Sequence, residues 1–292
     1  MSVATRRPAM HICSTVPRCP ELCIRVLPPK IRDLRGLWRR SLIAWPNGER
    51  DETTQVHWLQ GNEVCIDLRQ PETLPNFASR RGLAELSFED CLALAQQEGF
   101  AGRFAFDGEY FEWARQIDFQ PKALHSDAGS LRWEGAVLVE RGRDVDYIEH
   151  WHRDATALTP AAAVLLREID GRARAALLRV GTVFMWARDR TVVAPLHKTL
   201  TECVTEAASL SAAHALIDCE ISFGSVDSAG LLVTASSLPY RVGDRLEPKH
   251  WAGRLTTQDR AAAGTVVTRH WEITDMEGEL GEIAVQTAAS TV

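Results

Sequence analysis

The sequence predicts a mainly β protein built from two antiparallel barrels, each with a short helix. From Leu34 onward, short segments of alternating polar and apolar residues are separated by turn signals, mostly at glycine. The 292 residues exceed the ~120–170 that one small barrel needs. Two features also recur along the chain: a capped helix starts at Ser87 and at Thr199, and a His-Trp pair falls at 150–151 and 270–271. A duplicated barrel would produce this repetition.

The expected strands of the first barrel form a meander. They are residues 34–45, 53–60, 64–68, 103–106, 110–119, 130–133, 136–140 and 145–153. Ser87 is a good N-cap with Asp90 at the capping-box position, so a helix is expected to start there and to end at Gly99. Eight strands are enough to close a small barrel.

The second half repeats this outline. Its expected strands are residues 164–169, 173–180, 182–187, 220–225, 231–235, 253–257, 266–273 and 283–287. A helix is expected from Thr199, with Glu202 in its capping box. Five prolines and no periodicity make residues 1–30 an expected disordered tail. We therefore expect a first barrel over 31–156 and a second over 157–292.

Composition excludes several classes of protein. A net charge of -6 without clustered Lys and Arg argues against nucleic-acid binding. The apolar runs are too short to cross a membrane. Seven cysteines, an odd number with four in apolar segments, favour a reducing cytoplasm. The spacing of Cys13, Cys19 and Cys23 does not match a structural zinc site. We expect no metal and no cofactor, and motifs of common hydrolases and nucleotide-binding proteins are absent.

Residues 36–38, Gly-Leu-Trp, resemble the G-x-W element of lipocalins and related calycins. In that superfamily the Trp closes the barrel floor and an Arg from the last strand packs on it, which implies these roles for Trp38 and Arg153. Residues 135–137, 147–153 and 178–187 are similar in order and spacing to the fungal Hri family. That family comprises a casein-kinase-interacting protein with two calycin-like barrels and no established enzymatic activity. The resemblance implies a lipocalin-like, two-barrel fold.

Strand alternation predicts which side chains face the lumen of the first barrel. Arg40 would follow Trp38, and Arg115 and Ile117 would follow Trp113. The expected ligand-binding residues are Trp38, Arg40, Trp58, Phe111, Trp113, Tyr147 and Trp151. Arginines in an apolar lumen must be paired or must bind something. They either form a structural Arg-Glu bridge or hold an anionic head group such as a carboxylate.

An enzymatic interpretation uses the same lumen, with Glu149 and Arg115 as catalytic residues. Burial would raise the pKa of Glu149 so that it could exchange a proton, while Arg115 stabilises developing negative charge. Phenolic acid decarboxylases, barrels of this class, work through an Arg-Glu pair. His150 and His152 could ligate a metal together with Glu112, His57 or His125, but alternation places them outside the barrel.

Three functions therefore compete. The first is binding of a small, largely apolar, carboxylate-bearing molecule in the first barrel. The second is a cofactor-independent enzyme of the lyase, isomerase or decarboxylase type. The third is a non-catalytic protein-interaction scaffold whose lumens are filled by side chains. The first two predict a small-molecule partner, and the volume of the cavity separates them from the third.

Overall fold

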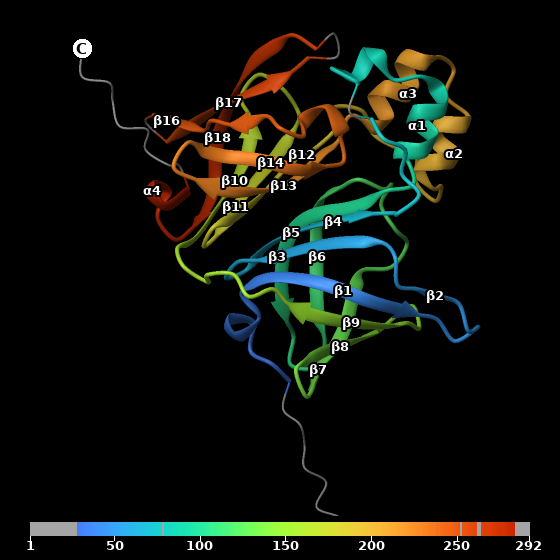
Figure 1. Cartoon of the computed structure of the whole chain (residues 1–292), viewed down its shortest axis with the longest axis vertical. Coiled ribbons are helices and arrows are strands. Elements are labelled where there is room, and N and C mark those ends of the chain that lie inside the picture. Colours follow the sequence, from blue (N-terminus) through green and yellow to red (C-terminus); the bar gives the residue numbers. More distant parts are fainter. Residues whose placement is uncertain (1–27, 78, 252, 262–263, 284–292) are drawn as a thin grey trace, which may run out of the picture.

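The computed structural model describes residues 28–77, 79–251, 253–261 and 264–283 (Figure 1). Most of the tail expected over 1–30 lies outside the described residues, as does nearly all of the strand expected over 283–287. Within the described ranges, no helix has the length and apolar character that crossing a membrane requires.

The first sheet closes into a barrel because β1 pairs with both β3 and β9. Eight strands make up the barrel, as expected, and β2 extends β1 as a short hairpin. The strands are β1 (Gly36–Ala44), β2 (Arg50–Asp51), β3 (Gln55–Gln60), β4 (Val64–Gln70), β5 (Glu98–Phe106), β6 (Phe111–Asp118), β7 (Asp127–Glu134), β8 (Val137–Gly142) and β9 (Ile148–Arg153). Strand β5 starts earlier than expected. Gly99 lies in this strand rather than ending a helix. Glycine suits the position because a Cβ there would come within 2.6 Å of the Asp67 carbonyl oxygen.

The second sheet also has nine strands, in the order β15-β14-β13-β12-β11-β10-β18-β17-β16. They are β10 (Ala161–Glu168), β11 (Arg174–Val180), β12 (Val183–Arg188), β13 (Glu220–Asp227), β14 (Gly230–Ser236), β15 (Arg245–Leu246), β16 (Lys249–Trp251), β17 (Arg254–Arg260) and β18 (Val266–Glu277). Among the described residues its edge strands β15 and β16 do not pair, so it is a curled half-barrel. The prediction of a mainly β fold with two barrel-like sheets is confirmed.

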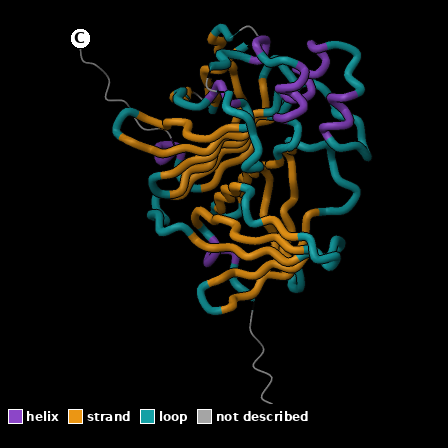
Figure 2. The backbone as a smooth tube through the Cα atoms, turned by 45° about the vertical axis from the view of Figure 1, so that its right-hand side comes forward, coloured by secondary structure: helices purple, strands orange, loops and turns teal. Residues whose placement is uncertain are grey.

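Three helices gather at one end of the molecule, coloured purple in Figure 2. Helix α1 (Phe88–Leu94) connects β4 to β5, and α2 (Leu200–Thr205) and α3 (Leu210–Ile217) connect β12 to β13. The capping boxes predicted from the sequence are present, Ser87 with Asp90 and Thr199 with Glu202. The short elements are η1 (Ile31–Leu34), η2 (Leu83–Glu85), η3 (Pro239–Arg241) and α4 (Leu280–Ile283).

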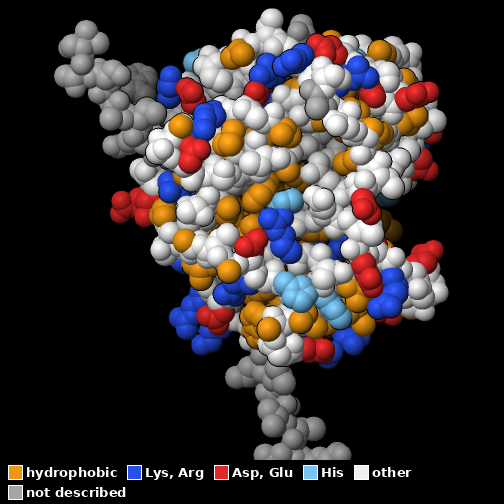
Figure 3. All heavy atoms as spheres, in the orientation of Figure 1, with side chains coloured by type: hydrophobic (Ala, Val, Ile, Leu, Met, Phe, Trp, Pro, Cys, Tyr) orange, Lys and Arg blue, Asp and Glu red, His pale blue; other side chains and the backbone are white. Residues whose placement is uncertain are grey.

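The two sheets share one apolar core. Outward-facing side chains of the barrel, such as Leu59 and Ile66, pack with Leu178 and Met185 of the second sheet in one buried cluster. Separate clusters fill the inside of the barrel and the inside of the curled sheet. In the space-filling view of Figure 3, apolar side chains reach the surface where the sheets meet, between charged side chains of both signs.

A β-bulge in β6 changes which residues face the lumen. The register passes from Ala101 opposite Ile117 to Gly102 opposite Arg115, which leaves Gln116 as the extra residue. The expectation that Ile117 shares the lumenal face of Arg115 is therefore wrong. Ile117 is buried in the core between the sheets, because an extra residue reverses the alternation that follows it.

Replacing Gly102 by Ala tests how tightly this bulge is packed. A Cβ at Gly102 would clash with the backbone of Ala114, so Gly102→Ala should lower the free energy of unfolding by about 2 kcal/mol. Urea denaturation measures the change. Gly281→Ala is the control, because a Cβ there has nothing within 4 Å, and an equal effect of both substitutions would contradict the prediction.

His57 makes the core between the sheets sensitive to acid. Its ring lies 4.3 Å from the ring of Phe223, and burial, assisted by Arg39, lowers its pKa from 6.5 to about 3. Below pH 6.5 the unfolded chain binds a proton at His57 that the folded chain excludes, so stability falls as the pH falls from 6.5 toward 3. Between pH 8 and pH 4, the free energy of unfolding of His57→Leu should therefore fall by ~3 kcal/mol less than that of the unsubstituted chain.

Urea denaturation at the two pH values measures this difference. The exposed His250 provides the control, because His250→Leu should leave the pH dependence unchanged. The same loss of stability in His57→Leu as in the unsubstituted chain would rule out the proposed role of His57.

Candidate functional site

Aromatic rings fill the floor of the first barrel. Trp58 is central, with ring centroids 5.6 Å from Trp38, 5.7 Å from Trp113 and 5.2 Å from Trp151. Phe111 joins the cluster through Phe104, 5.3 Å away. These five expected ligand-binding residues therefore lie together, and much of their surface is covered by one another.

The closed end of the barrel has the Arg-Trp contact that the sequence suggested. The Arg153 guanidinium lies over the Trp38 ring, 4.8 Å from its centroid. The Trp38 indole nitrogen donates to the carbonyl oxygen of Leu34 in η1, at 2.7 Å, so η1 covers this end. Arg153 also donates to the Asp33 carbonyl oxygen.

A cluster of charged side chains lies above the aromatic floor. Arg40 donates to the Glu149 carboxylate at 2.7 Å, and the two side chains are 6% and 2% exposed. Arg69 lies 3.6 Å from the same carboxylate and 2.8 Å from Asp67. Glu149 is thus held as an ion-pair partner, which is the arrangement of a structural Arg-Glu bridge.

Glu140 is a buried carboxyl that the sequence analysis did not single out. It accepts hydrogen bonds from the Tyr147 hydroxyl at 2.7 Å and from the Trp151 indole nitrogen at 3.0 Å. Burial raises its pKa, and so do the carboxylates of Glu149, directly opposite in the β8–β9 ladder, and Asp127. Its neutral form is therefore favoured.

Arg115 lies at the other side of the lumen. Its guanidinium is 2.5 Å from Asp127 and 3.4 Å from Asp118, and it stacks over the Phe100 ring at 4.2 Å. Burial raises the pKa of Asp118 to about 6, although Arg115 and Arg190 oppose that shift. Asp118 Oδ1 is buried and accepts no hydrogen bond from the described part of the chain.

The pairing of β6 with β7 in the barrel wall is short beside Arg115. Only three residue pairs, from Phe111 opposite Gly129 to Trp113 opposite Asp127, join β6 to β7. Beyond them a cavity of about 950 Å3 begins, which we call the β6–β7 cavity. Its lining includes three of the predicted site residues, Trp113, Arg115 and Tyr147, but among the described residues that line it Glu149, Arg40 and the other predicted aromatics do not appear.

The rim of the β6–β7 cavity is apolar. Of the eleven large apolar side chains that the described residues expose, five lie here, which concentrates them at this opening. They are Leu124, Val145, Val192, Val193 and Leu196. Exposed apolar side chains gathered at one opening make this surface a candidate for binding.

Arg190, which the sequence analysis missed, supplies a buried positive charge to the lining. It is 7% exposed, and its Nη2 donates to the carbonyl oxygens of Asp118 and Phe119. Within the described ranges no carboxylate oxygen lies within 4 Å of its guanidinium nitrogens, unlike Arg40, Arg69 and Arg115. The only sequence signal was a charged residue that follows a fully buried strand, β12.

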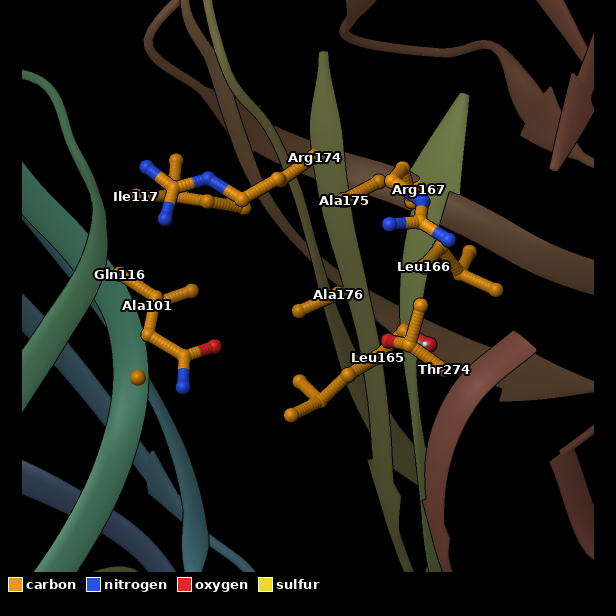
Figure 4. A pocket seen from close by; sticks show the side chains of 11 residues that line it. Ala101, Gln116, Ile117, Leu165, Leu166, Arg167, Arg174, Ala175, Ala176 and Thr274 are labelled. Atoms are coloured by element: carbon orange, nitrogen blue, oxygen red, sulfur yellow. Dashed lines mark hydrogen bonds between the residues drawn. The ribbon is translucent and has the colours of Figure 1, made fainter. Parts of the chain in front are cut away.

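A smaller cavity adjoins this site. Figure 4 shows side chains of β5 and β6 on one side and of β10, β11 and β18 on the other. The cavity between them measures about 220 Å3. Gln116 and Arg174 line both cavities. Ligand pockets usually measure ~300–1,000 Å3, so the β6–β7 cavity is the stronger candidate.

Comparison with known proteins found few similarities. None of the protein-family models matches the chain, and no curated protein does. Among solved structures, an uncharacterized protein, YLR301w of Saccharomyces cerevisiae, is similar with 14% sequence identity and a TM-score of 0.46. The similarity covers 83% of this chain and 98% of that one.

Removing one partner of the buried Arg40–Glu149 pair should be costly. Arg40→Met leaves a carboxylate inside the barrel with only the more distant Arg69, so the free energy of unfolding should fall by about 3 kcal/mol. Arg132→Met removes an exposed ion pair with Glu134 and should cost less than ~1 kcal/mol. Urea denaturation of both variants tests this ranking. Equal losses would show that the buried pair contributes no more to stability than the exposed pair.

Proposed function

We propose that the protein binds a small, largely apolar molecule that carries a carboxylate, and that the ligand occupies the β6–β7 cavity. The observation that supports this most directly is a buried guanidinium, Arg190, in the lining of a cavity whose rim is apolar, with no carboxylate oxygen of the described residues within 4 Å. The volume suits a small organic ligand.

The preference for a carboxylate follows from charge. A buried cation is costly unless it is paired or bound. Arg40, Arg69 and Arg115 already have carboxylate partners, whereas Arg190 bonds to carbonyl oxygens. A ligand carboxylate at Arg190 would form the charge-assisted hydrogen bonds that arginine favours.

The preference for an apolar body follows from the surroundings. Val192, Val193 and Leu196 come from the segment after β12, and Leu124 comes from the segment after β6, so both halves of the chain contribute. Covering these exposed side chains with an apolar ligand would remove them from water. Trp113 in the lining adds an aromatic contact.

This proposal refines the one drawn from the sequence. The ligand class is the same, and it accords with the resemblance to lipocalins and to the two-barrel Hri family. The site lies beside the barrel wall rather than among Trp38, Trp58 and Trp151. The scaffold hypothesis also has one supporting observation, because aromatic rings occupy the barrel floor. It predicts that no small molecule binds.

Tryptophan fluorescence titration with cinnamate and decanoate tests the proposal, since Trp113 lines the cavity. Both acids should quench the emission, and cinnamyl alcohol, which lacks the charge, should bind more weakly. Arg190→Gln should weaken binding of the acids at least about tenfold, because it removes the charged partner.

The control variant is Arg132→Gln, which removes an exposed arginine from β7 outside the cavity lining. It should leave the affinities unchanged. If neither acid binds, or if Arg190→Gln binds them as tightly as the unsubstituted chain, the proposed function is wrong.

A further inference from the structure

We infer that the β6–β7 cavity carries a proton-transfer activity, in which the Asp118 carboxylate removes a proton from a carbon next to a carbonyl of the bound acid. The inference rests on the proposed function, because it needs a carboxylate-bearing ligand at Arg190. It assigns the acid-base role to Asp118 rather than to Glu149, the residue that strand alternation suggested.

The bulge at Gln116 is what brings Asp118 into position. Without the extra residue, strict alternation would place Arg115 and Ile117 on one face and Asp118 on the other. With it, Ile117 packs between the sheets, and Asp118 lies beside Arg115 in the cavity lining. Bulges are frequent next to active sites, where they redirect a side chain.

The contacts of Asp118 leave it able to accept a proton. Its carboxyl accepts a long hydrogen bond from Arg115 at Oδ2, 3.4 Å, and one from the backbone N–H of Gln120, while its Oδ1 has no partner in the described part of the chain. Glu149, by contrast, is bound at 2.7 Å by Arg40 and does not line the cavity in the described ranges. The side chain of Asp118 is 18% exposed, so a ligand in the cavity can approach it.

Two cations lie near the Asp118 side chain. Arg115 is the ion-pair partner of its carboxylate, and Arg190 donates to the backbone carbonyl oxygen of Asp118. With Arg190 engaged by the ligand carboxylate, Arg115 is the group placed to stabilise negative charge on a neighbouring carbonyl oxygen. Burial raises the pKa of Asp118 to about 6, so it is ionised at neutral pH yet is a stronger base than an exposed carboxylate.

The ligand class that this arrangement suits is a 2-oxo acid with an apolar substituent on C3. Asp118 takes a proton from C3, the C3–H electron pair forms the C2=C3 double bond, and the carbonyl π electrons move to oxygen. The protonated Asp118 then gives its proton to that oxygen, which yields the enol. Atoms and electrons balance without an oxidant or reductant. The enol hydroxyl exchanges its proton with D2O, and the reverse reaction through Asp118 then places deuterium on C3.

Phenylpyruvate is a suitable probe because it has a phenyl group, a carboxylate and an acidic C3. Proton NMR in D2O follows the loss of its C3 signal, and tryptophan fluorescence measures its binding in the same buffer. The unsubstituted chain should accelerate exchange above the buffer rate. Asp118→Asn should lower this acceleration about 100-fold while the affinity changes less than about threefold. The rate should rise from pH 5 to 7 and then level, as Asp118 ionises between Arg115 and Arg190.

The control Asp170→Asn, in the exposed turn between β10 and β11, should retain full exchange. Thermal denaturation confirms that both variants are folded. Binding of phenylpyruvate without accelerated exchange, binding of cinnamate but not of phenylpyruvate, or unchanged exchange in folded Asp118→Asn would overturn the inference and leave the binding function intact. Absence of binding by every acid would instead refute the proposed function.

Discussion

Charge enclosed by a closed sheet has to be neutralised inside that sheet, and this constraint governs the first half of the molecule. Once β1 pairs with β9, the charged groups of Arg40, Arg69 and Glu149 lie above a buried aromatic floor. An isolated ion in this setting would cost several kcal/mol. The side chains therefore pair with one another. Pairing is incomplete at Asp118, whose Oδ1 has no partner among the described residues, and Asp118 lies beside the short pairing of β6 with β7.

The second half also pairs its buried charges with one another, using different residues. Its curled sheet encloses an arginine, Arg188, that contacts Asp218 at 2.7 Å and Asp259 at 3.1 Å. The late tryptophans also correspond. Trp151 lies opposite Leu138 and donates to Glu140, and Trp271 lies opposite Leu255 and donates to Thr257 at 2.9 Å. In each half the acceptor stands two residues beyond the apolar partner, so the indole holds the same position in both halves while its acceptor differs.

Local chemistry explains which features the sequence could predict. Alternation and turn residues located the strands, and capping boxes located α1 and α2, because both depend on residues close together in the chain. The bulge at Gln116 could not be predicted, since it arises where β6 must fit both β5 and the second sheet. The position of Asp118 beside Arg115 could not be predicted for the same reason. Glu140 and Arg190 were missed because their roles come from partners on other strands, and the open edge of the second sheet depends on pairings that no single segment specifies.

Strand β4 shows how the shared core constrains the evolution of the sequence. From Val64 to Leu68 every residue is buried, one face toward the lumen and the other toward the second sheet. Such a strand has no solvent-exposed face on which polar substitutions can accumulate. A substitution in β4 must therefore fit the packing of both halves at once. A change in one half then selects for a compensating change in the other. We expect the two halves to evolve together and not as exchangeable modules.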